Sequence, residues 1–140
     1  MKQKFSHSWI SSRQPRKQRK YQHNAPLNIL HNLLSAHLSK ELRKKYSIRN
    51  IQLRKGDSIK ICRGQFKKRL GKIERILLKK HKVHVSGIEH AKKSGEKSFY
   101  PIHPSNLVIT ELNLDDKKRV EKLNKRKLTA SKEKAKGDKK

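Results

Sequence analysis

Short runs of alternating apolar residues, separated by glycines, restrict what the middle of this chain can fold into. The runs cover residues 57–63, 72–78, 82–86, 97–100 and 106–112. Alternation puts every second side chain on one face, as in a half-buried β-strand, and the glycines between runs indicate turns. Because the runs recur at roughly ten-residue spacing, residues 48–114 are predicted to form a small β-barrel rather than a βαβ unit.

A helical pattern precedes the strands, over residues 25–47. Leucines recur at helical spacing at positions 27, 30, 33 and 34, and Pro26 suits the first turn of such a helix. Ser39 is predicted to cap a second short helix, because its hydroxyl can accept a hydrogen bond from a free amide of the first turn. Helices this short are unstable alone, so both must dock on protein or RNA.

The flanking segments are strongly basic. The chain has 39 Lys and Arg against 11 Asp and Glu, a net charge of +28, and only 31% hydrophobic residues. A fully folded domain usually has about 45–50%, so a small core with basic extensions is predicted. Residues 1–24 are interpreted as an extended cationic arm. Residues 115–140 are interpreted as a basic helix, begun by Asp115-Asp116 and docked through Val120 and Leu123, with a lysine-rich tail. This charge predicts binding to a polyanion, most commonly nucleic acid.

Several classes are excluded by what the sequence lacks. No apolar run approaches the about 18–20 residues of a transmembrane helix, and the first residues lack the apolar stretch of a signal peptide. The single cysteine, Cys62, excludes an intramolecular disulfide and a cysteine-based zinc site. The histidines form no closely spaced ligand pair backed by cysteine or clustered carboxylates. We therefore expect no metal, no cofactor and no catalytic residue, in an intracellular protein that is not an enzyme.

Residues 55–73 carry the strongest functional signal. A loop over residues 63–72 joins two predicted strands and places five bases around Phe66. The backbone amides of Gly64 and Gly71 can approach phosphates closely, since no side chain blocks them, and Phe66 can stack on an unpaired base. The alternative is an ordinary solvated hairpin with a buried phenylalanine.

This stretch resembles the KOW motif of small SH3-like barrels in ribosomal and transcription proteins. Four further segments are similar, in the same order, to the large-subunit ribosomal protein twenty-four family, in the archaeal and eukaryotic branch that is called twenty-six in eukaryotes. They are residues 21–27, 38–46, 54–57 and 100–110. In that family a glycine usually follows the lysine of the loop, where this chain has Lys68.

The resemblance implies a mainly β protein, an SH3-like barrel that binds the first domain of large-subunit ribosomal RNA and acts early in assembly. It implies a position near the exit of the nascent-peptide tunnel on the cytoplasmic ribosome, with neighbouring large-subunit proteins as partners. Neither membrane insertion nor a small-molecule substrate is expected. Residues 88–97 match the family's extended hairpin near the tunnel exit, and a mobile hydrophilic loop is the alternative there.

The candidate RNA-binding residues are basic, aromatic, glycine and short polar residues of the arm, the second helix and the loops. They are Arg13, Arg16, Lys17, Arg19, Lys20, Tyr21, His23, Asn24, Arg43, Lys44, Arg54, Lys55, Arg63, Gly64, Phe66, Lys67, Lys68, Arg69, Gly71, Lys72, His103, Ser105 and Asn106. The last three could donate to phosphate or 2′-OH groups, and a purely structural turn is the alternative for them.

Other functions remain open on the sequence alone. A KOW-type transcription elongation factor is the nearest rival, although the chain lacks room for the mixed α/β domain of such factors. An RNA-cleaving enzyme is poorly supported, because the acids are scattered. A chromatin or membrane-surface binder would explain the charge but not the ordered family segments.

Overall fold

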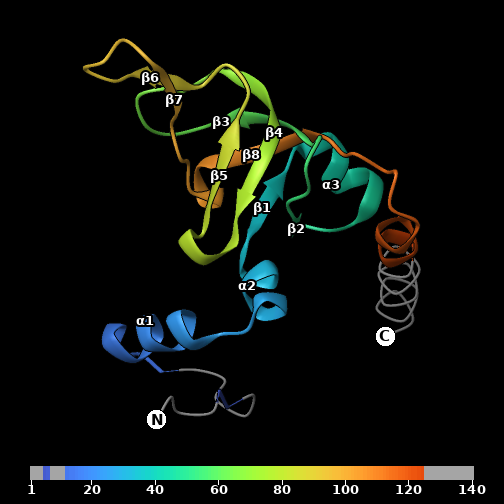
Figure 1. The fold of residues 1–140 in the computed structure, drawn as a ribbon. Coiled ribbons are helices and arrows are strands. Elements are labelled where there is room, and N and C mark those ends of the chain that lie inside the picture. The colour runs from blue at the N-terminus through green and yellow to red at the C-terminus, as the bar shows by residue number, and fades with distance from the viewer. Residues whose placement is uncertain (1–4, 7–11, 125–140) are drawn as a thin grey trace, which may run out of the picture.

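The computed structural model describes residues 5–6 and 12–124, so Trp9 and the lysine-rich tail lie outside the described residues. The helices are α1 (Pro15–Asn24), α2 (Leu27–Leu33) and α3 (Lys40–Tyr46), and residues 117–124 are also helical. The strands are β1 (Ser35–Leu38), β2 (Asn50–Gln52), β3 (Ser58–Ile61), β4 (Leu70–Leu77), β5 (Lys82–Val85), β6 (Glu89–Ala91), β7 (Lys97–Phe99) and β8 (Leu107–Glu111). Two short 3-10 turns are η1 (Leu78–Lys80) and η2 (Pro104–Asn106). Figure 1 shows the sheet in the centre, α1 at one end and the β6–β7 hairpin at the other.

The strands form one large sheet and a separate hairpin. Six strands pair in the order β2-β1-β8-β3-β4-β5, and β6 pairs with β7. All pairs are antiparallel except β1 with β8. Among the described residues, β2 and β5 at the two ends of the order do not pair with each other. The predicted β-rich domain is confirmed, but the sheet does not close into a barrel, because the run at residues 97–99 pairs with β6 instead of extending the sheet.

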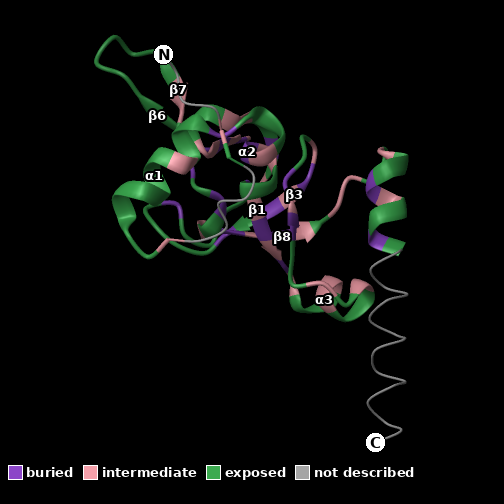
Figure 2. Ribbon diagram, turned by 90° about the horizontal axis from the view of Figure 1, so that it is seen from below, coloured by how far each residue is buried: buried purple, intermediate pink, exposed green. Residues whose placement is uncertain are grey.

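Alternation along the strands builds the core, as the sequence predicted. Ile59 and Ile61 of β3, and Val83 and Val85 of β5, are at most 1% exposed. Figure 2 shows the buried segments gathered in the sheet, while α1 and the β6–β7 hairpin are largely exposed. The core therefore belongs to the sheet, and the ends of the molecule are left to polar and charged side chains.

Strand β1 was not predicted, because it lies inside the region interpreted as helical. Ala36 and Leu38 are buried, and β1 pairs antiparallel with β2 and parallel with β8.

The predicted apolar face of helix α2, which precedes β1, is only partly correct, since Leu27 is 55% and Leu33 45% exposed. The cap at Ser39 is confirmed, because its hydroxyl accepts a hydrogen bond from the amide of Leu42 at 3.3 Å.

The N-terminal arm is not extended over its second half. Residues 15–24 form α1, which starts at Pro15 and has no buried residue. Proline is well suited to the first turn of a helix, and the Arg, Lys and Gln residues that follow it are good helix formers. The prediction of an extended arm is therefore wrong for this segment, and its bases lie along an exposed helix.

The C-terminal helix docks as predicted through Leu123, which is 1% exposed, whereas Val120 is only partly buried. Asp116 begins this helix, because its Oδ1 accepts a hydrogen bond from the amide of Lys118 at 3.0 Å. A second anchor was missed in the sequence. Arg119, 5% exposed, donates from Nη1 to Oδ1 of the fully buried Asp57 at 2.6 Å and from Nη2 to its Oδ2 at 2.8 Å.

The Arg119–Asp57 pair joins several parts of the chain. Asp57 also accepts hydrogen bonds from the backbone amides of Arg54 and Asn113, both at 2.9 Å. Arg119 donates further to the carbonyl oxygen of Asn113 at 2.7 Å and to that of Gln52 at 3.1 Å. The pair therefore holds together the end of β2, the start of β3, the segment after β8 and the C-terminal helix.

Candidate nucleic-acid interface

The β3–β4 loop, residues 62–69, is a tight cationic turn. No acid occurs from residue 58 to residue 73. From residue 63 to residue 72 the exposed basic residues are Arg63, Lys67, Lys68, Arg69 and Lys72. Two backbone hydrogen bonds close the loop, from Ile61 to the carbonyl of Arg69 at 2.9 Å and from Lys68 to the carbonyl of Ile61 at 2.8 Å. Since these like charges repel each other in the free protein, residues beneath them must hold the loop in shape.

Lys68 adopts a backbone conformation that favours glycine. Its φ is 72°, in the left-handed region, which costs a residue with a side chain about 1–2 kcal/mol. This is the position where the resembled family usually has glycine. The loop thus retains a glycine-like turn and gains a positive charge at that point.

Phe66 does not present its ring to a base, so the prediction that it stacks on RNA is corrected. It is 8% exposed and belongs to the core. The ring of Tyr100 lies 5.2 Å away between centroids, and the guanidinium carbon of Arg69 lies 5.2 Å from the Phe66 centroid. Burial of a large aromatic side chain stabilises by about 1.5–3 kcal/mol. Phe66 therefore anchors the loop from beneath. This agrees with the alternative prediction that the phenylalanine is buried.

The two glycines of this region differ. A Cβ on Gly71 would lie 2.6 Å from Cγ1 of Val85 and 2.8 Å from the carbonyl oxygen of Ser86. Gly71 is therefore required for the close approach of β4 to β5, a packing role that the sequence did not predict. Gly64 has a φ of 91° and nothing within 4 Å of a Cβ, so its backbone is accessible.

A groove of about 210 Å³ lies between the β3–β4 loop and residues 100–106. It brings together residues that the sequence predicted separately, with Arg63 and Gly64 on one side and His103 and Asn106 on the other. Lys82 and Tyr100 also line this groove and were missed, since both lie outside the β3–β4 loop in sequence. We call it the Tyr100 groove.

The turn beside the groove has a structural role as well. Nδ1 of His103 accepts a hydrogen bond from the amide of Ser105 at 3.3 Å and lies 2.9 Å from its hydroxyl. The carbonyl of Asn106 accepts from the amide of Cys62 at 2.8 Å. These contacts fix the turn against the β3–β4 loop and place Asn106 in the lining of the groove.

The pKa values of two histidines near this region are lowered. For His103 the main cause is burial, followed by the positive charges of His81 and Lys82. For His84 the main cause is also burial, followed by the charge of Arg75. Both imidazoles are therefore biased towards the neutral form.

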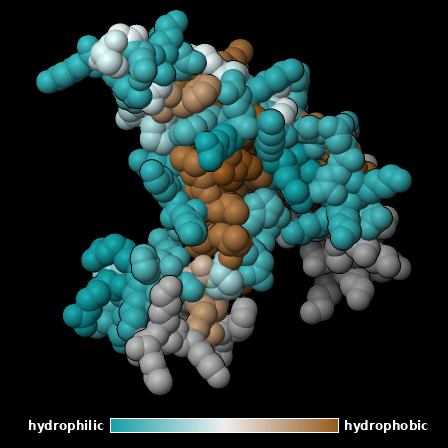
Figure 3. All heavy atoms as spheres, in the orientation of Figure 1, coloured by the Kyte–Doolittle hydropathy of each residue, from teal (hydrophilic) through white to brown (hydrophobic). Residues whose placement is uncertain are grey.

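The candidate residues of the arm lie at the opposite end of the molecule from the loop (Figure 1). Arg13, Arg16, Lys17, Arg19, Lys20, His23 and Asn24 are exposed on or just before α1, and Tyr21 is partly buried. A cavity of about 590 Å³ separates α1 and α2 from η1, and Arg19, His23, Lys79 and His81 contribute to its walls. The last two were not predicted. Figure 3 shows hydrophilic side chains at both ends of this face, with an apolar strip between them.

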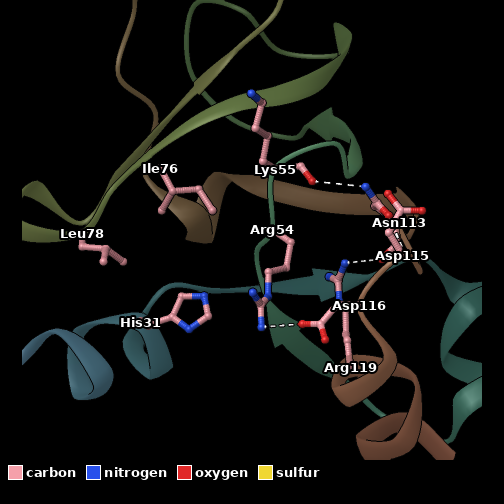
Figure 4. A pocket seen from close by; sticks show the side chains of 9 residues that line it. All are labelled: His31, Arg54, Lys55, Ile76, Leu78, Asn113, Asp115, Asp116 and Arg119. Carbon is pink, nitrogen blue, oxygen red and sulfur yellow. Dashed lines mark hydrogen bonds and ion pairs between the residues drawn. The ribbon is translucent and has the colours of Figure 1, made fainter.

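The remaining candidates are partly engaged within the protein. Nε of Arg43 donates to the carbonyl of Leu38 at 2.8 Å, and Lys44 is exposed. Nη2 of Arg54 lies 2.8 Å from Oδ2 of Asp116 across a cavity of about 420 Å³, while Lys55 points away from that ion pair (Figure 4). Because carboxylates line this cavity, it suits a phosphate less well than the acid-free loop does.

These surfaces define a class: a small β-rich protein whose exposed bases are placed to bind a polyanion. Within residues 5–6 and 12–124, no group of three His, Cys, Asp or Glu is placed to hold a metal ion. No helix in that same part of the chain has the length and apolar character needed to cross a membrane.

Comparison with known proteins identifies the family. Residues 12–126 match the family of ribosomal proteins described as eukaryotic L26 and its archaeal counterpart L24. The large ribosomal subunit protein uL24 of Methanosphaera stadtmanae is 48% identical over 115 residues, which are 82% of this chain and 98% of the relative. The chain therefore belongs to this family of ribosomal proteins, as the resemblance indicated. It is an RNA-binding protein of the large subunit of the cytoplasmic ribosome.

Proposed function

We propose that the chain binds the first domain of large-subunit ribosomal RNA, supports early subunit assembly and lies near the exit of the peptide tunnel. The observation that carries the proposal is the acid-free β3–β4 loop, whose bases are exposed while Phe66 beneath them is buried. A cationic loop held in one shape loses little conformational freedom when it binds, so it is well suited to fit the phosphates of a folded RNA.

We assign the sheet to an SH3-like arrangement and the β3–β4 loop to a KOW motif. In this arrangement the loop contacts one RNA segment and the exposed bases of α1 contact another, because the two lie at opposite ends of the molecule (Figure 1). Simultaneous contact with separate segments would fix their relative position, which is a role suited to early assembly.

The β6–β7 hairpin is the part that we place towards the tunnel exit and neighbouring large-subunit proteins. It extends from the sheet, and all of Glu89–Ala91 and the residues of its turn are exposed. Lys92 and Glu96 form an ion pair at 3.0 Å across the turn. The hairpin therefore carries charges of both signs, unlike the loop, and suits a protein-rich surrounding.

Ultraviolet cross-linking of the tagged protein to RNA in cells, followed by sequencing of the attached RNA, tests the proposal. We expect cross-links clustered in the first domain of large-subunit RNA, with cross-linked peptides from the β3–β4 loop and α1. Cross-links in other domains of that RNA would contradict the proposed location. Cross-links spread over nascent messengers would instead favour an elongation factor.

A further inference from the structure

We propose that Tyr100 stacks on one unpaired base of the large-subunit RNA, which lies in the Tyr100 groove. This inference rests on the proposed function and adds a base contact to an interface otherwise made to phosphates. It also transfers the stacking role from Phe66, which is buried, to the ring that packs on it.

Tyr100 is presented to solvent although its neighbours hold it in place. It is 41% exposed, and it is the aromatic residue among the large exposed hydrophobic side chains of the described chain. Its ring lies 5.2 Å from that of Phe66 at an interplanar angle of 60°, and the ring of His90 approaches at 6.2 Å and 90°. An aromatic ring fixed by such contacts and open to solvent is a platform on which any base can stack, since every base has a π-face.

The surroundings of the ring fit a nucleotide. Arg63 and Lys82 supply positive charge for the phosphates that flank a base, and Asn106 has an amide that can both donate to and accept from a base edge. The groove holds about 210 Å³, below the about 300–1,000 Å³ of pockets that enclose drug-sized ligands. This volume corresponds to roughly seven waters at about 30 Å³ each, which suits a single planar heterocycle.

A nucleotide fits this groove better than a segment of another protein. The residues that line the groove include no Asp or Glu. The adjoining loop adds further Lys and Arg residues, also without an acid. A protein segment that neutralised this region would have to be strongly acidic, whereas each nucleotide brings both a charge and a flat apolar ring. The combination of an exposed aromatic ring and cations is the usual design of a single-stranded RNA contact.

Binding of the full-length protein to a first-domain RNA fragment, measured at several salt concentrations, tests the inference with three variants. Tyr100→Ala and Tyr100→Leu should weaken affinity about 5- to 100-fold, whereas Tyr100→Phe should retain it. The slope of log K against log salt should stay unchanged in all three variants, because stacking releases no counterions. Removal of a Lys or Arg side chain that neutralises a phosphate would instead make the slope shallower. Tyr100→Leu retains an apolar side chain against Phe66, and thermal unfolding shows whether each variant is folded.

Leu70→Ala is the matched control, because Leu70 is 67% exposed at the start of β4 beside the same loop. Its affinity should equal that of the wild type. Equal weakening in Leu70→Ala and Tyr100→Ala would show a general apolar contact and overturn the inference. Wild-type affinity in Tyr100→Ala, together with a large loss in a variant without the loop bases, would also overturn it while leaving the proposed function in place. A wild-type protein that fails to bind the fragment would overturn the proposed function itself.

A fluorescent ring distinguishes a base from a protein neighbour. Tyr100→Trp, made in a Trp9→Phe background, leaves residue 100 as the tryptophan of the chain. Its emission should be quenched by the naked RNA fragment alone, because a stacked base quenches indole. Unchanged emission on binding of the naked RNA fragment would overturn the inference.

Discussion

Arg119 and the β3–β4 loop show two opposite uses of positive charge in one small protein. Arg119 is 5% exposed and donates to a carboxylate and two backbone carbonyls. The basic residues of the loop are exposed and lie in a stretch, residues 58–73, that contains no acid. The buried cation is therefore committed to the fold, and the exposed cations remain available to a partner. Because the two sets do not share contacts, stability and RNA affinity should be separable by mutation.

Removal of the buried cation should have the largest effect on stability. Arg119→Ala leaves Asp57 buried and uncompensated, and it should lower the free energy of unfolding by about 3–5 kcal/mol. Urea denaturation followed by circular dichroism measures this change. Arg119→Lys should also destabilise, since an ammonium cannot reproduce the two parallel hydrogen bonds of the guanidinium.

Arg54→Ala is the matched control, because Arg54 pairs with Asp116 in the same region but is about half exposed. An exposed pair of this kind contributes about 0–1 kcal/mol. Similar losses in Arg54→Ala and Arg119→Ala would contradict the distinction between the buried and the exposed cations.

Removal of the exposed bases should instead weaken RNA binding. Replacement of Arg63, Lys67, Lys68 and Lys72 by Ala should lower affinity for the first-domain RNA on the order of 100-fold near physiological salt, and slow subunit assembly. The slope of log K against log salt should become shallower by roughly 0.7 for each phosphate that is no longer neutralised. Filter binding across a salt series measures both quantities.

An equal change in net charge elsewhere controls for non-specific attraction. Lys40, Lys80, Lys93 and Lys97 are exposed and lie outside the loop. Their replacement by Ala should reduce affinity much less. Wild-type affinity in the loop variant would refute the assignment of the loop as an RNA-binding surface.

Lys68→Gly should move stability and affinity in opposite directions. Glycine relieves the left-handed conformation, a gain of about 1–2 kcal/mol, partly offset by about 0.5–1 kcal/mol of backbone entropy. A net stabilisation near 1 kcal/mol is expected, with a few-fold weaker RNA affinity from the removal of one charge. Lys68→Ala, measured in the same unfolding and binding assays, should lose the same affinity without the gain in stability. A destabilised Lys68→Gly protein would show that the side chain supports the loop.

The pH dependence of RNA binding through His103 should be the smallest effect. The pKa of His103 is lowered on folding, so the unfolded chain binds more protons than the folded chain at acidic pH. The free energy of unfolding should therefore fall as the pH falls below about 6.5. An adjacent phosphate favours the protonated form, so RNA affinity should rise as the pH falls from about 7.5 to about 5.5, by no more than about tenfold. Binding assays of wild type and His103→Ala should differ in this slope. Identical pH profiles would exclude His103 from the interface.

Local patterns predicted five of the eight described strands, β3, β4, β5, β7 and β8, and the position of the exposed basic residues, because both depend on neighbouring residues. The alternation around Ile59 and Val83 marked the core, and the bases beside Gly64 marked the loop. Both predictions needed only residues within a few positions of each other.

Features set by distant contacts were missed. Asp57 and Arg119 are charged residues that alone suggest the surface, and only the packed structure brings them together. Phe66 was given the wrong role because it packs in a core built from residues far along the chain, and Tyr100 contacts its ring. Strand β1 was obscured by helical sequences on both sides, and its pairing with β8 overrides their pattern.

The pairing of β1 with β8 has a consequence for how this protein is made. His37 pairs with Val108, so the middle of the sheet joins segments from near the two ends of the described chain. The entropy cost of closing so long a loop comes before the stabilising contacts between β1 and β8 form, and this slows folding. The pairing of β1 with β8 can form only after the chain has been synthesised through Ile109. The protein therefore emerges during synthesis as a long, unfolded and strongly positive chain. At that stage it most needs an anionic partner to neutralise its charge.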